Sequence, residues 1–235
     1  MKKTYIISFL VIFLLIIVSY FGSYYFMKEK VKEVPMEKKE DVLKANSGTK
    51  MYTSDQTVYV LEKYDAHATF FVLGTNVERY PDEIKRMHKI GCEVGNHSYD
   101  HEDLSKLKKV GLKKQLNATN QMVQSITGQG VALMRPPYGA ISTTMKKQLK
   151  QPMILWNIDT LDWKTRNAKK TMKAVMKDVK DGDIILMHDI HSETIDAAVK
   201  LIPKLQEKGY QLVTVSEMAA AKGIQLEAGE RYTDF

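Results

Sequence analysis

The chain has 235 residues and a formal net charge of +7, and 27% of its residues are charged. This length suffices for one full-sized domain and an additional terminal segment. The lysines are scattered and form no dense basic block, which argues against a nucleic-acid partner and favours loose attraction to an anionic matrix or polymer. The single cysteine, Cys92, excludes an intramolecular disulfide and, beside an apolar run, is predicted to be a core residue.

The N-terminus carries an uncharged segment, 4–27, that is long enough to span a bilayer. The segment ends in bulky aromatic residues typical of a membrane interface, without the small residues of a signal-peptide cleavage site. We therefore predict an uncleaved transmembrane helix within residues 1–27, in preference to a cleaved signal peptide. Residues 28–43 have mixed charges and few large apolar side chains, which predicts a tether. The expected arrangement is a single-pass protein of the cell membrane with an extracellular domain at 44–235.

Apolar runs alternate with segments of helical pattern along the outer domain. Strands are predicted at 68–73, at a run ending in Asn96, and at 131–134, 153–158, 184–187 and 211–215. Helices are predicted at 81–89, at 104–127, after Ser142, at 168–180 and at 194–208, with a short helix last. Alternating strands and helices predict parallel strands joined by right-handed crossovers. The predicted fold class is therefore α/β, with six such strands, and a seventh if one precedes Asp55, in a barrel or an open sheet.

Polar residues follow four of the predicted strands at the point where each strand ends. They are His97 with His101, the segment 135–139, Asp159 with Asp162 and Trp163, and His188 with Asp189. Each group alone has a simple structural explanation, as a surface charge, a turn, a helix cap or a core histidine. Because parallel α/β folds assemble their sites at the carboxyl ends of strands, four such groups at one end favour a single functional site.

His97 and His101 are four residues apart, which places both imidazoles on one side of a predicted helical turn. Neutral imidazoles are ligands of zinc and of neighbouring transition metals, and two of them need at least one further ligand. Taken alone, the pair favours the simpler interpretation, two histidines on a helix face that bind no metal. The polar groups after the other strands favour the metal site.

Four motifs resemble those of the polysaccharide deacetylase family, the NodB-homology or carbohydrate esterase family 4 enzymes. They are Asn96-His97-Ser98-x-x-His101, Arg135-Pro-Pro-Tyr-Gly139, Asp159-x-x-Asp162-Trp163 and Leu186-x-His188-Asp189. The similarity covers nearly the whole outer domain. It implies an irregular (β/α) barrel of about seven parallel strands. It also implies metal-dependent removal of acetyl groups from N-acetylglucosamine units of peptidoglycan or chitin-like glycan.

The resemblance assigns the histidines and one aspartate to the reaction itself. It implies that His97 and His101 bind a divalent metal, with zinc expected and cobalt, manganese or nickel as alternatives. The metal would polarise the amide carbonyl and activate a water molecule. His188 would then act as the general acid that protonates the leaving amine, and Asp162 would orient His188.

The remaining motif residues are implied to support the reaction and to hold the substrate. Arg135 would hold the carboxylate of the general base, and the backbone N–H of Tyr138 would help to stabilise the oxyanion. Tyr138, Trp163 and Leu186 would be substrate-binding residues, the last two as walls of a small pocket for the acetyl methyl group.

The family's first motif, Thr-Phe-Asp-Asp-Gly, is altered in this chain. An ungapped count back from Ala68 places Asn46 at the position of the general base and Ser47 at the position of the third metal ligand. An amide does not accept a proton at neutral pH, and a serine hydroxyl is a poor zinc ligand, so the resemblance implies weakened metal binding. A gapped alternative would use Asp55, which is expected at the start of the next helix.

Two hypotheses of function remain open. The first is a membrane-anchored, metal-dependent deacetylase of cell-wall glycan. The second is a catalytically impaired or inactive relative that binds cell-wall glycan or a partner protein, as Asn46 and Ser47 suggest. A zinc hydrolase unrelated to this family is a third and more distant reading of the same polar residues.

Overall fold

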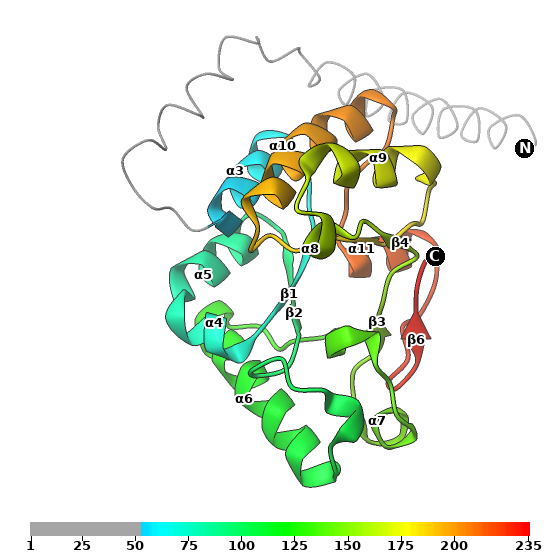
Figure 1. Ribbon diagram of the computed structural model, residues 1–235. Coiled ribbons are helices and arrows are strands. Elements are labelled where there is room, and N and C mark those ends of the chain that lie inside the picture. The colour runs from blue at the N-terminus through cyan, green and yellow to red at the C-terminus, as the bar shows by residue number, and fades with distance from the viewer. Residues whose placement is uncertain (1–52) are drawn as a thin grey trace, which may run out of the picture. The chain divides into compact units, whose positions relative to one another are not determined.

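The domain is built on short parallel strands, seen in the computed structural model, which describes residues 53–235 (Figure 1). β1 (Thr69–Val72) pairs with β2 (Glu93–Asn96), β3 (Met153–Ile154) with β6 (Arg231–Tyr232), and β4 (Ile158–Asp159) with β5 (Ile185–Leu186). All three pairs are parallel. Single parallel bridges from Met134 to Asn96 and to Met153 connect the first two pairs. The predicted transmembrane helix, the tether, Asn46 and Ser47 lie outside the described residues.

Helices cover these strands and connect them. They are α3 (Thr53–Lys63), α4 (Gly74–Arg79), α5 (Pro81–Lys89), α6 (Lys109–Thr127), α7 (Thr143–Gln148), α8 (Asp162–Thr165), α9 (Ala168–Asp178), α10 (Ser192–Glu207) and α11 (Val215–Ala221). Two 3-10 turns, η2 (Leu104–Lys106) and η3 (Pro137–Gly139), complete the list. α10 packs between α3 and α9 (Figure 1). In residues 53–235 no helix has the length and apolarity to cross a bilayer.

The predicted α/β alternation is confirmed, but several elements differ from their predicted form. The predicted strand 153–158 is interrupted, because the Arg135 side chain donates hydrogen bonds to the carbonyls of Ile154 and Leu155, at 3.0 and 2.9 Å. These bonds take carbonyls that a continuous ladder would use. The predicted strand 131–134 is reduced to the bridges of Met134.

Other differences lie at helix ends and at the C-terminus. No strand forms at 211–215, because Thr214 instead caps α11 in a reciprocal capping box with Glu217. The predicted helix 104–127 is divided into η2 and α6. β6 and α4 were not predicted: β6 has only two residues, and α4 directly precedes the helix that Pro81 begins.

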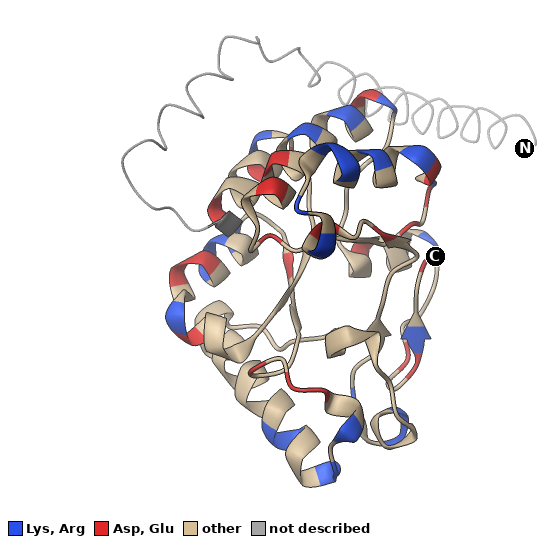
Figure 2. Ribbon diagram, viewed as in Figure 1, with Lys and Arg blue, Asp and Glu red and all other residues tan. Residues whose placement is uncertain are grey.

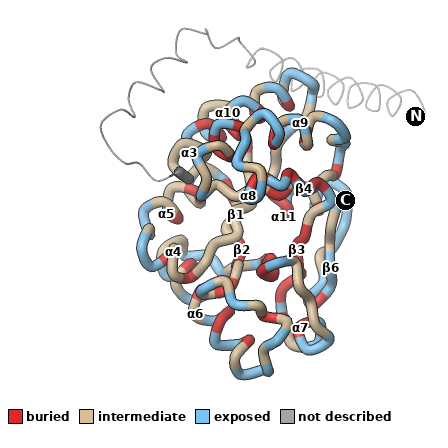
Figure 3. Tube along the Cα trace, viewed as in Figure 1, coloured by how far each residue is buried: buried red, intermediate tan, exposed pale blue. Residues whose placement is uncertain are grey.

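The buried apolar side chains of the described residues fall into four clusters. Figure 3 marks the buried parts of the chain in red. α10 contributes buried Ala197, Leu201 and Leu205 to the cluster that it shares with α9, and buried Ile202 to the cluster that it shares with α3. Cys92 is buried among apolar residues, as predicted, and burial raises the pKa of its thiol to about 11. A thiol with this pKa stays protonated at neutral pH and is a poor nucleophile.

Gly95 in β2 allows an aromatic side chain to lie directly against the strand that leads to His97. A Cβ atom at residue 95 would meet the ring of Phe71 at 2.5 Å. The same ring lies under the Arg135 guanidinium, with the Arg135 Cζ atom 4.3 Å from the ring centroid. The absence of a side chain at Gly95 therefore sets the position of Phe71 and, through it, the support of Arg135.

We expect Gly95→Ala to lower the free energy of unfolding by about 1–3 kcal/mol, the usual effect of overpacking a core. Gly130→Ala is the matched control, since a Cβ atom there meets no heavy atom within 4 Å. The control should change stability by less than about 0.5 kcal/mol. Urea denaturation of the two variants and the wild type measures the difference, and equal stabilities would refute the packing constraint at Gly95.

Candidate active site

The loop after β2 brings His97 and His101 together. Their ring centroids are 5.0 Å apart and the rings are nearly perpendicular. The predicted helical turn is wrong: the segment is an irregular loop, in which Ser98 and His101 have φ angles of 76° and 68°. The Ser98 hydroxyl accepts a hydrogen bond from the His101 backbone N–H at 2.9 Å, which holds this conformation.

Asn96 is the buried side chain on which this loop is built. Its Oδ1 atom accepts a hydrogen bond from the Ser98 backbone N–H at 2.7 Å. Its Nδ2 atom donates to the Leu116 carbonyl at 2.9 Å and to Asn120 Oδ1 at 2.7 Å, both in α6. A buried amide with all these partners fixes one loop conformation, because any other would leave polar groups unpaired.

Both histidines are suited to bind a metal in their neutral form. His97 Nδ1 donates to the Arg135 carbonyl at 2.6 Å, which leaves Nε2 as the atom with a free lone pair. Burial lowers the pKa of His97 to about 4, and burial also lowers the pKa of His101. The pair fits a divalent metal in its chemistry, but across residues 53–235 no third histidine, cysteine or carboxylate completes a ligand set.

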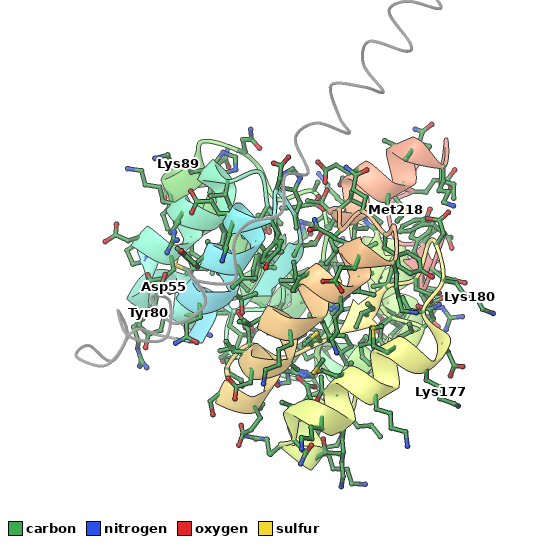
Figure 4. All side chains as sticks on the ribbon, turned by 90° about the horizontal axis from the view of Figure 1, so that it is seen from above. Asp55, Tyr80, Lys89, Lys177, Lys180 and Met218 are labelled. Atoms are coloured by element: carbon green, nitrogen blue, oxygen red, sulfur yellow. The ribbon has the colours of Figure 1, made fainter. Side chains whose placement is uncertain are left out.

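Asp55 does not supply the third ligand in the structure. It lies in α3, near the helix start as predicted, with its Oδ1 atom 3.5 Å from Arg86 Nη1 of α5 (Figure 4). Its carboxylate is thus engaged by Arg86 and belongs to no group with the two histidines.

His188 and Asp162 form the second half of the site. The Asp162 carboxylate accepts hydrogen bonds from His188 Nδ1 at 2.9 Å, from the His188 backbone N–H at 2.6 Å and from the Thr194 hydroxyl at 2.8 Å. Asp162 is only 1% exposed, and burial by itself raises its pKa. The hydrogen bonds from His188 and Thr194 outweigh burial and hold the pKa of Asp162 well below its usual range. Asp162 is therefore a carboxylate that fixes His188.

The two halves lie at the same end of the strands. The charges of His188 and Arg135 both act on His97 and contribute to its lowered pKa, and His188 acts on His101 in the same way. The ring of Tyr138 packs edge-on against His101, with centroids 4.7 Å apart. The polar groups predicted after four strands therefore converge, as the carboxyl ends of parallel strands require.

Arg135 is a nearly buried cation between two aromatic rings. Its Cζ atom lies 4.3 Å from the Phe71 ring centroid and 5.7 Å from that of Trp156. Burial lowers its pKa to about 9, so the guanidinium stays charged at neutral pH. Among the described residues no carboxylate lies within ion-pair distance of it. The predicted role of Arg135, to hold the carboxylate of a general base, stays a prediction.

The predicted substrate-binding residues differ in their exposure. Tyr138 is 69% exposed and has a left-handed backbone, with φ 61°. Trp163 is 49% exposed in α8, whereas Leu186 in β5 is buried. Thr194 was not anticipated from the sequence, because a threonine inside a helix carries no chemical signal until its carboxylate partner is known. The Arg166–His191 pair described below was missed for the same reason.

Comparisons with known proteins agree with the motifs. The family profile described as "Polysaccharide deacetylase" matches residues 35–153. The chain is 42% identical over 201 residues to "Peptidoglycan-N-acetylmuramic acid deacetylase PdaC" of Bacillus subtilis, covering 83% of this chain and 43% of that protein. It is 37% identical to "Peptidoglycan-N-acetylglucosamine deacetylase PgdA" of Listeria monocytogenes, covering 87% of this chain and 44% of that protein. The chain thus spans less than half the length of these two relatives.

Solved structures show the same fold. The structure of PdaC has a TM-score of 0.71 and 45% identity, covering 73% of this chain and 85% of that one. A family 4 acetyl xylan esterase from Clostridium thermocellum, in complex with a cobalt ion, has a TM-score of 0.74 and 28% identity, covering 80% and 95%. A family 4 pseudoenzyme from Bacillus anthracis has a TM-score of 0.67 and 29% identity, covering 77% and 64%. A mutant of it is described as having restored enzymatic activity.

The chain belongs to the polysaccharide deacetylase family, carbohydrate esterase family 4, a family of metal-dependent hydrolases. Its fold is the NodB-like α/β fold of that family. Within the family it is close to the peptidoglycan deacetylases PdaC and PgdA.

Replacing Thr194 by valine should lower the free energy of unfolding by about 1.5–3 kcal/mol, the usual value for a hydrogen bond to a charged group. Thr171→Val is the matched control: Thr171 is also buried within a helix, but its hydroxyl has no hydrogen-bond partner. Loss of that hydroxyl should be neutral or stabilising. Thermal or urea denaturation distinguishes the variants, and an equal loss in both would show that the Thr194–Asp162 bond contributes nothing specific.

Proposed function

We propose that this chain is a deacetylase domain that hydrolyses the N-acetyl group of N-acetylglucosamine units in cell-wall glycan, with a divalent metal, zinc in the first place, held at His97 and His101. The observation that carries the proposal is the His188–Asp162 pair placed at the same rim as two neutral imidazoles. The printed names of PdaC and PgdA support peptidoglycan as the substrate.

In this proposal His188 is the proton donor. Its Nδ1–H bond to Asp162 orients the ring and leaves Nε2 to carry the proton that the leaving amine receives. The buried carboxylate stabilises the imidazolium that forms before the transfer. The Tyr138 backbone N–H would donate to the developing oxyanion, while Trp163 and Leu186 would bound the acetyl group. When bound, the metal would supply Lewis-acid polarisation of the amide carbonyl and activation of water.

We also propose a cellular location for the domain. An uncharged segment at 4–27 and a charged tether at 28–43 would anchor the domain to the cell membrane on the side of the cell wall. An anchored domain with net positive charge meets the anionic wall polymer at a high local concentration.

A second candidate function is a catalytically silent member of the family that binds glycan or a partner protein. Asn46 and Ser47 favour it, since they replace the general base and the third metal ligand in the ungapped placement. The occurrence of a pseudoenzyme among the structural relatives supports the same reading. Under this hypothesis the His188–Asp162 pair is present although the protein hydrolyses no substrate.

The wild type separates the two candidates, because only the deacetylase requires zinc binding and acetate release from the unchanged chain; restoring the first motif tests the site itself. The double variant Asn46→Asp with Ser47→Asp should raise zinc stoichiometry toward one. Acetate release from N-acetylglucosamine oligomers should rise by about 10²–10⁴, the usual contribution of a general base. Ser47→Asp alone should recover metal more than rate, because it adds a ligand but no base. Zinc content and acetate release are measured on the wild type and both variants.

The matched control is Asn117→Asp with Ser125→Asp, which makes the same charge change at exposed positions of α6. This control variant should change neither the zinc content nor the rate of acetate release. A double first-motif variant that binds no zinc and releases no acetate would contradict the deacetylase proposal and leave the silent relative. A wild type that already turns over as fast as the double variant would show that the base and ligand come from other residues.

A further inference from the structure

Arg166 has a guanidinium that the structure holds in one orientation. Arg166 Nε donates to the Trp163 carbonyl at 2.9 Å, and Nη1 donates to His191 Nδ1 at 2.7 Å. Its backbone is left-handed, with φ 44°, and so is that of Leu161, with φ 51°. α8 is therefore held between two residues in a conformation that non-glycine residues adopt at a cost, a feature that often accompanies functional sites.

This guanidinium belongs to the same rim as the proposed proton donor. Its partner His191 directly precedes α10, and the His191 carbonyl accepts a hydrogen bond from the Thr194 backbone N–H at 3.0 Å. Thr194 in turn donates to Asp162, and Asp162 binds His188. The charges of Asp162 and His188 also act on His191. Arg166 is thus connected to His188 through His191, Thr194 and Asp162, without being part of the reacting group.

The carboxylates of Asp162 and Glu193 act on His191, the partner of Arg166, but neither pairs with Arg166. Within residues 53–235 no carboxylate makes an ion pair with it. The closest sequence neighbours add positive charge, since Lys164, Lys169 and Lys170 are all exposed. Basic segments recur along α8 and α9 (Figure 2), and near the end of α9 Lys177 and Lys180 extend outward (Figure 4). Close to Arg166 itself, the exposed lysines are those at 164, 169 and 170.

An exposed aromatic side chain lies on the same turn. Trp163 lies in α8 and Arg166 caps the C-terminal end of that helix, and the hydrogen bond from Arg166 Nε to the Trp163 carbonyl holds the guanidinium beside the Trp163 backbone. An exposed indole offers a flat apolar face with a polar edge, which suits contact with a sugar ring. The exposed indole and the fixed guanidinium therefore belong to α8 and its C-terminal cap, and α8 begins with Asp162, the partner of His188.

We propose that Trp163 and Arg166 form a subsite for a carboxylate-bearing sugar of the glycan strand, next to the sugar that is deacetylated. The sugar ring would contact Trp163 while its carboxylate binds the free edge of the Arg166 guanidinium. This inference rests on the proposed function, in that it takes cell-wall glycan as the ligand. In such glycan the carboxylate comes either from the lactyl group of muramic acid or from the attached peptide.

The test is the affinity of Arg166→Gln for charged and neutral glycans. Three probes are used: a glucosamine–muramic acid oligomer without peptide, the same oligomer with its peptide, and a neutral chitin oligomer of equal length. We expect the variant to bind the carboxylate-bearing oligomers about five- to tenfold more weakly than the wild type, and the chitin oligomer within twofold. Loss with the peptide-free oligomer identifies the lactyl carboxylate, and loss only with the peptide-bearing oligomer identifies the peptide.

Lys173→Gln is the matched control, because it removes one positive charge from an exposed position of α9 and should change no affinity by more than twofold. Equal weakening for charged and neutral oligomers would overturn the subsite in favour of a structural role. An unchanged affinity of Arg166→Gln would also overturn the subsite. The same holds for a wild type that binds neither of the two carboxylate-bearing oligomers. Should Arg166→Gln not fold, Arg166→Lys replaces it, with an intermediate loss confined to the charged oligomers expected. Acetate release, measured separately, reports on the proposed function alone.

Discussion

The buried Asp162 carboxylate, with hydrogen bonds from His188 and Thr194, is the interaction on which the site depends. Three donors from the chain around the start of α10 converge on this one side chain at the start of α8. An isolated carboxylate in this position would be costly, whereas one with three donors is held ionised. The same bonds tie α8 to the segment after β5 and set the direction of the His188 ring. Because the carboxylate is buried, this alignment is fixed before any ligand arrives.

A second polar arrangement, around Asn96 and Arg135, aligns the other half. Asn96 shapes the loop that carries the two histidines, and the Arg135 carbonyl selects the tautomer of His97. The Arg135 side chain meanwhile donates to the carbonyl of the last residue of β3, Ile154, and to that of Leu155, which ends the strand early. The irregular strands are therefore a consequence of the site: backbone groups that would pair in a regular ladder bind the site's side chains instead.

The alternation of strands and helices and the residues of the site could be predicted from the sequence, but their local geometry could not. The strand 68–73 and the helix beginning at Pro81 were predictable from apolar runs and a helix-starting proline. The prediction of a helical turn at His97 and His101 was wrong, because the spacing of the two histidines does not show that Ser98 and His101 have positive φ angles. The interrupted strand after Met153 likewise depends on a distant arginine, which no local pattern reveals. The roles of Thr194 and Arg166 could not be predicted from the sequence, because they depend on contacts with Asp162 and His191 that only the folded chain makes.

The proposed function depends above all on the binding of one metal ion by His97 and His101, at the rim that also carries His188. Anomalous diffraction at the zinc edge, from crystals of the full chain soaked at high zinc concentration, tests it most directly. We expect one anomalous peak about 2.0–2.1 Å from Nε2 of both His97 and His101. A zinc ion bound elsewhere on the chain, with no peak between these two rings, would contradict it.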